Sequence, residues 1–439
     1  MKVLERHASS VSPARRGLTL RLVTVLAAGL FLLQAASPAR SQTVAPNLRD
    51  FVGVNHLIGG NWSQQLGVGW FRFDIPWMSV EAQQGTMNWA ATDKEMQNAQ
   101  ALGGQVLPML GYTPAWDQTV KSSGQAPPKN PQDWANFVQA AVSRYSAAPY
   151  NVRYFQVWNE PTQKASFWLG TDNQYIDMIY LPAAKIIRQH GCYVVFGGWP
   201  ASNSVQELDT VLNYHNAWQW TDYVDLHYQG IANLQHEYAQ WVGNGKCRGL
   251  WETEVGYNTD PEFFGLYLQV LAWTQQVGWR DPNQFKLFWF AAYAAGAEGD
   301  KDLLKQTGTT LQPTSHGAHL IVMNQVLGGG PLRPFTQFSS QPSTTPNVAT
   351  VNGISVGSNR TVLQFLMSRS LMQQRQSLTA SVSLPGQPSK VQLMSGLGKT
   401  WNLPVQYSGG RVQVNAPLHA DFDDCPTCHW VYGYLIIDR

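Results

Sequence analysis

Eight short segments rich in β-branched and aromatic residues recur between residues 51 and 292, and longer amphipathic stretches separate them. Strands that alternate with helices form a parallel sheet, because each helix returns the chain to the start of the next strand. Eight such units close a (β/α)8 barrel of the TIM type, so we predict an α/β fold built on that barrel. The predicted strands are residues 51–56, 70–77, 105–113, 153–160, 193–199, 223–228, 249–255 and 286–292.

The stretches between these strands have the apolar spacing of helices. Between the third and fourth strands, Trp134, Phe137 and Val138 stand at positions i, i+3 and i+4, which places them on one helix face. Asn130 and Pro131 precede them and supply a capping residue and a proline for the first helical position. The predicted helices are residues 91–102, 131–145, 173–189, 205–217, 234–242 and 261–277, with a closing helix at 315–327.

The pattern changes after residue 330, where short apolar runs are separated by Gly, Pro, Ser and Asn. Such spacing is typical of antiparallel strands joined by turns. We therefore predict a catalytic barrel at residues 42–330 and a small all-β sandwich domain at residues 331–439. The stretch 334–345 has the composition of a linker between them.

The first 41 residues have the pattern of an export signal. Three arginines between residues 15 and 21 precede an uncharged apolar run of 12 residues, 22–33, and small residues allow cleavage after Ser41. Spanning a bilayer takes about 20 residues, so an uncleaved anchor is the less favoured alternative. We expect a signal peptide at 1–41 and a secreted or periplasmic mature chain of 439 − 41 = 398 residues, without a membrane partner.

Composition limits the partners that the chain can bind. Charged residues make up 13% of the chain and the formal net charge is +2, so no strong field attracts nucleic acid, lipid headgroups or a polyanion. The 18 Trp and 17 Tyr residues can place an apolar ring against a ligand and keep a polar edge hydrated. The predicted partner is a neutral carbohydrate, and we expect a monomer.

Four cysteines would meet an oxidising environment after export. Cys425 and Cys428 enclose two residues and suit a local disulfide, whereas a zinc site would call for a second such pair nearby. Cys192 and Cys247 either form a disulfide or stay buried and free, and both alternatives remain open.

Polar or aromatic residues stand at the carboxyl ends of nearly all the predicted strands. In an eight-stranded α/β barrel these ends form one face, and that face carries the active site. One such residue would mean little, but their repetition predicts a binding site there. The residues are Asn55, His56, Arg72, Asp74, Tyr112, Asn159, Glu160, Trp199, His227, Tyr228, Glu254 and Trp289.

Two of these residues are glutamates on well-separated strands. Glu160 ends the fourth strand, because Pro161 cannot donate to a strand ladder, and Glu254 lies near the end of the seventh. A pair of carboxyl groups across a barrel mouth is what acid/base-assisted cleavage of a glycosidic bond needs. Adjacent residues of a strand point to opposite faces, so Asn159 and Glu160 can share one site only if the strand bulges at its end.

Glu252 is an alternative to Glu254, because the two side chains share one face of the seventh strand. Gly256 marks the loop that follows, which places Glu254 nearer the open end. A carboxylate buried as deeply as Glu252 needs a hydrogen-bonding or charged partner, and we expect Arg72 or His227 to be that partner. We therefore assign the reactive role to Glu254 and a supporting role to Glu252.

Four motifs resemble those of clan A glycoside hydrolases, and of family 39 and related exopolysaccharide-cleaving enzymes in particular. The resemblance covers roughly residues 50–330 and implies that Glu160 is the general acid/base, that Glu254 is the nucleophile and that Asn159 donates to a sugar hydroxyl. The motifs are Phe71-Arg72-Phe73-Asp74-Ile75-Pro76-Trp77, Gly111-Tyr112-Thr113-Pro114-Ala115-Trp116, Trp158-Asn159-Glu160-Pro161 and Thr253-Glu254-Val255-Gly256.

The chain departs from the family pattern on the sixth strand. Family members usually have a Tyr two positions after the His, whereas Tyr228 directly follows His227 here, which puts in doubt a hydrogen bond from Tyr228 to the nucleophile. Arg72 is expected to orient a carboxylate through a bidentate contact.

Other residues are predicted to bind sugar, each with a structural alternative. His56 and His227 either contact sugar hydroxyls or are structural, and Tyr112 and Tyr228 complete the predicted polar contacts. The tryptophans either stack on sugar rings or belong to the core: they are Trp77, Trp116, Trp168, Trp199 and Trp289, of which Trp289 is the best placed.

These observations predict a secreted retaining glycoside hydrolase that cleaves β-linked poly- or oligosaccharides by double displacement, without a cofactor or a metal. His316 and His319 have helical i, i+3 spacing but no acidic partner, so we expect them to be structural. The alternatives are a noncatalytic carbohydrate-binding or matrix protein that keeps the barrel as a scaffold, and a transglycosylase that uses the same two carboxylates.

Overall fold

The computed structural model of the chain describes residues 44–256, 262–293, 301–345, 348–418, 422 and 428–439. The predicted signal peptide at 1–41 and Cys425 lie outside these residues. Within them, no helix has both the length and the apolar character needed to cross a membrane.

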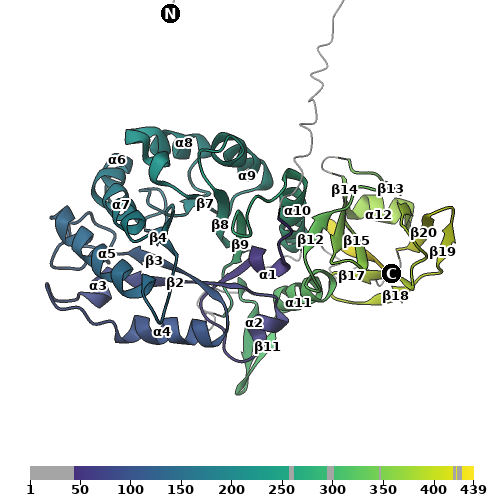
Figure 1. Ribbon diagram of the computed structural model, residues 1–439, viewed down its shortest axis with the longest axis horizontal. Helices are drawn as coiled ribbons and strands as arrows, with labels where there is room; N and C mark the ends of the chain where they lie inside the picture. The colour runs from purple at the N-terminus through teal and green to yellow at the C-terminus, as the bar shows by residue number, and fades with distance from the viewer. Residues whose placement is uncertain (1–43, 257–261, 294–300, 346–347, 419–421, 423–427) are drawn as a thin grey trace, which may run out of the picture. The chain divides into compact units, whose positions relative to one another are not determined.

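The predicted barrel is confirmed. Its parallel strands follow the order β5-β4-β3-β2-β1-β9-β8-β7-β6, and a further pairing of Val195 in β5 with Tyr223 in β7 closes the ring (Figure 1). The fifth predicted strand is divided into two short ones, β5 and β6. The strands are β1 (Val52–Asn55), β2 (Trp70–Pro76), β3 (Gln105–Gly111), β4 (Tyr154–Val157), β5 (Tyr193–Val195), β6 (Trp199–Pro200), β7 (Tyr223–His227), β8 (Gly249–Val255) and β9 (Phe285–Trp289).

Gly198 explains the division of the fifth strand. Its φ is 55°, and a Cβ built on it would lie 2.1 Å from His227 Nε2. Only glycine adopts this backbone without strain and leaves room for the imidazole. The interruption therefore makes space for His227 inside the barrel.

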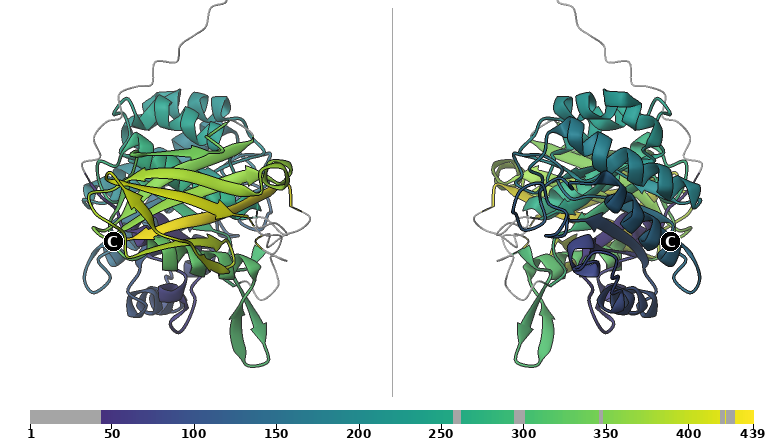
Figure 2. Two further views of the ribbon diagram at one scale, coloured as in Figure 1. Left: turned by 90° about the vertical axis from the view of Figure 1, so that its right-hand side faces the viewer. Right: turned by 90° about the vertical axis from the view of Figure 1, so that its left-hand side faces the viewer.

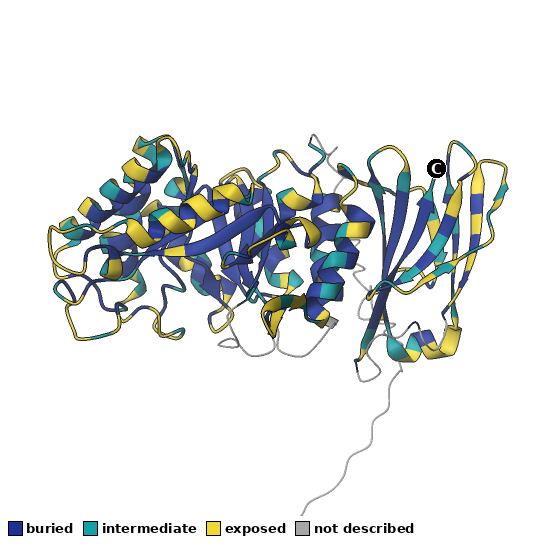
Figure 3. Ribbon diagram, turned by 90° about the horizontal axis from the view of Figure 1, so that it is seen from below, coloured by how far each residue is buried: buried dark blue, intermediate teal, exposed yellow. Residues whose placement is uncertain are grey.

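Helices surround the strands, and every predicted helix is present (Figure 1). Helix α5 begins as expected, since Asn130 accepts a hydrogen bond from Gln132 N and Pro131 follows it. Buried faces turn toward the strands and exposed residues turn outward (Figure 3). The helices are α1 (Leu48–Phe51), α2 (Trp62–Gln65), α3 (Trp77–Val80), α4 (Ala90–Ala101), α5 (Pro131–Ser146), α6 (Asp172–Gln174), η1 (Tyr175–Tyr180), α7 (Leu181–Gln189), α8 (Val205–Asn213), η2 (Tyr214–Trp220), α9 (Ile231–Glu237), η3 (Tyr238–Val242), α10 (Glu262–Val277), α11 (Ser315–Leu327) and α12 (Arg369–Arg375).

A hairpin that the sequence pattern did not predict precedes α11. It consists of β10 (Leu304–Thr307) and β11 (Thr310–Pro313), paired antiparallel. The hairpin projects away from the barrel strands (Figure 2).

An aromatic layer fills the barrel at the starting ends of the strands. Trp70, Tyr154, Tyr223, Trp251 and Phe288 form a buried cluster there. Further along β2 and β4, the inward side chains become polar. The interior is thus packed at one end, and the polar side chains of the site lie toward the carboxyl ends.

The C-terminal strands form two antiparallel sheets that share a hydrophobic core, as predicted for a sandwich. The orders are β12-β14-β15-β21-β17-β18 and β13-β16-β20-β19. The expected linker at 334–345 is wrong, because β13 pairs with β16 along its length, with Ser339 exposed and Ser340 half-buried. The strands are β12 (Leu332–Pro334), β13 (Phe338–Gln341), β14 (Ala349–Val356), β15 (Arg360–Ser368), β16 (Ser377–Ser383), β17 (Lys390–Ser395), β18 (Thr400–Asn402), β19 (Gln406–Ser408), β20 (Arg411–Pro417) and β21 (Trp430–Asp438).

Three of the four cysteines lie within the described residues. Cys192 and Cys247 are buried and free, and Cys428 is disulfide-bonded.

Candidate active site

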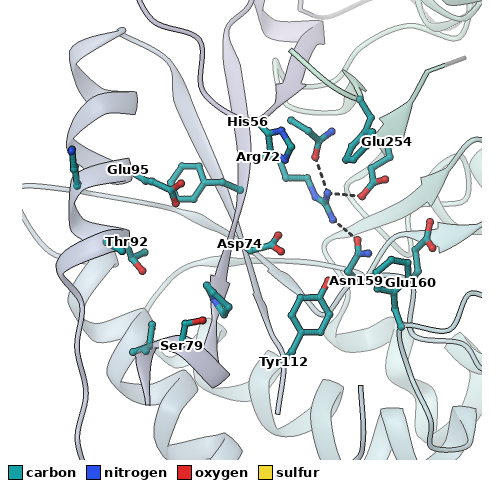
Figure 4. Close-up of a pocket in the computed structure, with 18 of the residues that line it drawn as sticks. His56, Arg72, Asp74, Ser79, Thr92, Glu95, Tyr112, Asn159, Glu160 and Glu254 are labelled. Carbon is teal, nitrogen blue, oxygen red and sulfur yellow. Dashed lines mark hydrogen bonds and ion pairs between the residues drawn. The ribbon is translucent and has the colours of Figure 1, made fainter. Parts of the chain in front are cut away.

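A cleft of about 780 Å³ opens at the carboxyl ends of the barrel strands. It extends from Glu160 and Glu254 across β2 to helix α4 (Figure 4). Its lining residues are Asn55, His56, Arg72, Phe73, Asp74, Pro76, Ser79, Val80, Asn88, Ala91, Thr92, Lys94, Glu95, Tyr112, Asn159, Glu160, Phe167, Glu254 and Phe290.

The two predicted carboxylates meet in this cleft. One oxygen of Glu160 lies within 4.8 Å of one oxygen of Glu254. Strand β4 ends at Val157, and the backbone then leaves extended geometry, with φ of 71° at Trp158 and 42° at Glu160. This irregular turn lets consecutive Asn159 and Glu160 both line the cleft, as the sequence argument required. Left-handed backbone at a residue other than Gly is costly and is concentrated at functional sites.

Arg72 connects the polar residues around Glu254. Its Nη1 donates to Glu254 Oε1 at 2.7 Å and to Asn55 Oδ1 at 2.8 Å, and its Nη2 donates to Asn159 Oδ1 at 2.6 Å (Figure 4). Because guanidinium nitrogens only donate, the amide oxygen of Asn159 must face Arg72. The Asn159 amide nitrogen is thereby oriented as a donor for a ligand in the cleft.

Tyr228 contacts Glu254 despite the altered spacing on the sixth predicted strand. Its hydroxyl donates to Glu254 Oε2 at 3.3 Å, and Tyr228 is absent from the cleft lining. Two local features re-aim the side chain: the pairing of β7 with β8 shifts after Leu226, and Tyr228 has a φ of 54°. The structure thus shows the contact with Glu254 that the altered spacing had put in doubt, and the expectation that Tyr228 binds sugar stays a prediction.

His227 was also expected to contact sugar, and this is wrong. It is fully buried and lies beneath the carboxylates, with Nδ1 3.0 Å from Glu160 Oε1 and 3.6 Å from Glu254 Oε1. Burial lowers the pKa of His227 to about 3, so the imidazole is neutral at neutral pH.

A chain of hydrogen bonds fixes which nitrogen of His227 carries its proton. Thr253 Oγ1 donates to Asp225 Oδ2 at 2.6 Å and lies 3.0 Å from His227 Nε2. When Asp225 is ionised, the hydroxyl gives its one proton to Asp225, so His227 Nε2–H donates to Thr253. Nδ1 then carries a lone pair, which accepts a proton from Glu160. Burial raises the pKa of Asp225 well above its ordinary value, and the donors on Thr253 and the charge of Arg72 act against that shift.

Glu160 has the properties of a carboxylic acid that stays protonated near neutral pH. Burial raises the pKa of Glu160 to about 7, against the opposing charge of Arg72. Protonation also suits the lone pair of His227 Nδ1. The two neighbouring carboxyl groups lie in different surroundings, because Glu254 pairs with Arg72 and Glu160 lies against His227.

Glu252 is placed where the sequence argument put it, but with another partner. It is 2% exposed and its Oε1 accepts from Gln229 N at 2.6 Å. Neither Arg72 nor His227 contacts it, because Arg72 is engaged by Glu254 and His227 by Glu160 and Thr253. Burial raises the pKa of Glu252 well above its ordinary value.

The predicted stacking tryptophans belong to the core. Trp77, Trp168, Trp199 and Trp289 are 1% exposed or less, and each indole N–H donates to protein oxygen. Trp116 is half-buried, donates to Glu81 O and packs edge-on against Trp77. None of these five residues lines the cleft. Sequence alone does not tell which face of a strand end turns inward, and here the indoles turn away.

The aromatic and polar residues that do line the cleft include the expected His56 and Tyr112. His56 is exposed at the end of β1 and lies 5.8 Å from the ring of Phe290, centroid to centroid. Asp74 and Glu95 place two further carboxyl groups on the wall toward α4 (Figure 4).

Three residues that support the site were not predicted. Gln156 Oε1 accepts from Arg72 Nε at 2.6 Å and its Nε2 donates to Asp225 Oδ2, while Thr253 joins Asp225 to His227. A signal was available, because Gln156 and Asp225 are polar residues inside otherwise apolar strands. Such a side chain points into the barrel and needs buried partners.

The cleft is poorly suited to a resident cation. One atom each of Glu160, His227 and Glu254 lies within 4.8 Å of the others, as a metal site would require. Arg72, however, is 2.7 Å from Glu254 Oε1 and already supplies the positive charge. This arrangement agrees with chemistry by carboxyl groups alone.

Comparisons with known proteins agree with the predicted resemblance at the level of fold. No family model matches the chain. The structure is similar to a family 39 glycoside hydrolase from Bacteroides cellulosilyticus WH2, with a TM-score of 0.60, 14% identity and coverage of 90% of this chain and 81% of that one. It is also similar to a family 30 endoxylanase from Clostridium papyrosolvens C71, with a TM-score of 0.61, 15% identity and coverage of 90% and 97%.

Two further comparisons return proteins that are named as glycosidases. A glucosidase from Croceicoccus marinus has a TM-score of 0.60 at 12% identity, with coverage of 91% of this chain and 97% of that one. A β-xylosidase from Caldicellulosiruptor saccharolyticus is 33% identical over 76 residues, which is 16% of this chain and 15% of that protein. The chain thus has the TIM-barrel fold of glycoside hydrolases and matches a small part of the curated relative.

Proposed function

We propose that the chain is an exported retaining glycoside hydrolase that cleaves β-glycosidic bonds in a neutral poly- or oligosaccharide. The observation that carries the proposal is the approach of Glu160 and Glu254 to within 4.8 Å in an open cleft. Retaining enzymes hold their two carboxyl groups about 5 to 5.5 Å apart, whereas inverting enzymes need about 6.5 to 9.5 Å to admit a water. The shared fold and the glycosidase relatives support the same reaction.

The mechanism follows from the surroundings of each carboxyl group. Protonated Glu160 gives its proton to the glycosidic oxygen as that bond breaks, while Glu254 forms an ester bond with the anomeric carbon. Arg72 and Tyr228 hold the two oxygens of Glu254 in place. Glu160, now a carboxylate, takes a proton from water, which attacks the same carbon and releases Glu254.

The walls of the cleft favour an uncharged substrate. Asp74 and Glu95 add two carboxyl groups to the catalytic pair, and Lys94 is the cationic lining residue besides Arg72. Like charges repel, so a polyuronate would be disfavoured. Xylan and β-glucans are the first substrates to screen, given the names of the similar proteins.

The stereochemistry of the products tests the proposal. The chain, expressed without residues 1–41, would be incubated with the polysaccharide screen, and new reducing ends would be followed by proton NMR before they mutarotate. We expect the first product to have the β configuration of the substrate. An α product would contradict double displacement, and binding without any released sugar would favour the noncatalytic alternative.

Replacing Thr253 with Val tests how the buried hydrogen-bond chain controls Glu160. Without the hydroxyl, the His227 proton can move to Nδ1 and donate to ionised Glu160, which lowers the pKa of Glu160. A hydrogen bond to a charged group is worth about 1.5 kcal/mol, or about one pH unit. We expect the alkaline limb of kcat/KM to move about one unit toward acid in T253V. The control T253S keeps the hydroxyl and should keep the wild-type limb; an unmoved limb in T253V would refute this role.

A further inference from the structure

Three potential metal ligands meet outside the barrel, between helices α8 and α9, which lie next to each other (Figure 1). Asp209 belongs to α8, and His236 and Glu237 end α9. One ligand atom of each lies within 4.8 Å of the others. His236 Nε2 is 2.9 Å from Asp209 Oδ2 and 3.9 Å from Glu237 Oε1.

Glu237 has no satisfying partner in the described part of the chain. Its side chain is 0% exposed, and neither carboxylate oxygen has a hydrogen bond. The ion pairs formed by Asp209 and Glu237 among these residues involve His236 alone. A buried carboxylate without donors is costly, and such a group in a native protein is explained by a bound proton, a water or an ion.

The position of Asp209 is fixed by a second contact. Trp241 Nε1 donates to Asp209 Oδ1 at 2.9 Å, and Oδ2 is the oxygen near His236. Hydrogen bonds of this kind orient the ligands of metal sites, because one oxygen is held while the other faces the ion. The Asp209 and His236 side chains are 18% and 39% exposed, which gives an ion a path from solvent.

We propose that Asp209, His236 and Glu237 bind a divalent transition-metal ion of the zinc type. One imidazole and two carboxylates suit such an ion, whereas Ca²⁺ and Mg²⁺ take oxygen ligands. At bond lengths of about 2.0 to 2.2 Å, neighbouring ligand atoms lie roughly 3 Å apart. The contact between Asp209 and His236 already has that spacing. A small rotation of the Glu237 side chain would bring its carboxylate within the same distance of His236. Water on the exposed side completes the coordination.

The ion would act as a structural link. It would join α8 to α9 and give Glu237 a positive partner in place of an unsatisfied one. The catalytic cleft is formed by other residues, so this site is independent of the proposed hydrolase activity. The contrast with Glu160, His227 and Glu254 is informative, since Arg72 supplies the charge there, whereas no Lys or Arg among the described residues pairs with Asp209 or Glu237.

Zinc retention and thermal stability test the site. Full-length mature protein without a histidine tag would be treated with EDTA, dialysed, loaded with Zn²⁺ and dialysed again before elemental analysis. We expect about one zinc per chain and, at a hundred times the dissociation constant, a Tm increase of about 4 °C. Ca²⁺ and Mg²⁺ should leave Tm unchanged. Absence of retained zinc and of any Tm shift would overturn the proposal.

Matched variants locate the ion. E237Q keeps the shape of the side chain but removes its charge, so it should equal or exceed the wild-type Tm in EDTA and lose the zinc response. H236N should lose that response as well. H215N removes an exposed histidine elsewhere and should respond like wild type. Zinc responses of equal size in wild type and E237Q, or loss of the response in H215N, would refute this assignment.

Discussion

Replacing Glu254 with Gln should lower kcat/KM at least about a thousandfold on the polysaccharide that the product screen identifies. An amide is a poor nucleophile, and a thousandfold loss corresponds to about 4 kcal/mol of transition-state stabilisation. The change keeps the shape of the side chain. Its oxygen can still accept from Arg72 and its nitrogen can donate to the Tyr228 hydroxyl, so the fold should persist. Steady-state kinetics would measure the loss of kcat/KM, and an unchanged Tm would show that the fold persists.

Glu252 provides the control for this variant. It lies two residues away on β8, is as buried as Glu254 and is absent from the cleft lining. E252Q should retain activity within about tenfold, because Gln229 N can still donate to the amide oxygen. Equal losses in E252Q and E254Q would leave no special role for Glu254. A residual activity of E254Q within tenfold of wild type would remove it as the nucleophile.

A smaller variant identifies the step that is lost. E254A leaves space beside the anomeric carbon, which azide can enter while Glu160 still protonates the leaving oxygen. The product should then be an α-glycosyl azide, because a single displacement inverts the carbon. A β-glycosyl azide would contradict attack from the position of Glu254.

The sequence predicted the barrel because each of its elements had an independent signal. Periodic apolar residues and caps marked helices such as α5, and eight apolar strands alternating with helices are typical of a closed barrel. The pattern failed where local polarity was misleading. Serines in β13 suggested a linker at 334–345, although alternation of exposed and half-buried residues is also what an edge strand shows. The division at Gly198 depended on His227, which is distant in sequence.

The candidate site was predictable as a set of strand ends, but not in its side-chain directions. Glu160 and Glu254 meet because the chain turns irregularly at Trp158, and Tyr228 reaches Glu254 through left-handed backbone. Residue spacing carries no information about such turns. The inward position of His227 and the outward position of Trp289 instead follow the strand period of two, because Tyr223 and Phe288 point into the barrel. In the sequence, the buried hydrogen-bond network is indicated only by polar residues inside apolar strands, such as Gln156.

Glu160→Ala should have an effect that depends on the leaving group. A sugar leaves poorly without a proton, so hydrolysis of the polysaccharide should fall about a thousandfold. The variant lacks proton transfer in both steps, and a loss of this size lies within the usual contribution of general acid–base catalysis. An activated aryl glycoside leaves unaided, so formation of the glycosyl-enzyme should fall far less. Its breakdown would still lack a base, and a rapid burst of phenol should precede slow turnover. Equal losses on both substrates, without a burst, would contradict the role of Glu160.

The pH profile gives the same residue a second readout. Glu160 is active in the first step as an acid, and burial raises its pKa to about 7. Activity should therefore be full below that pH and fall as pH rises through it, because the proton needed by the leaving oxygen is lost. In E160A this alkaline limb should disappear from kcat/KM of the activated glycoside, while E252Q should keep it. An alkaline limb that persists unchanged in E160A would show that another group carries the proton.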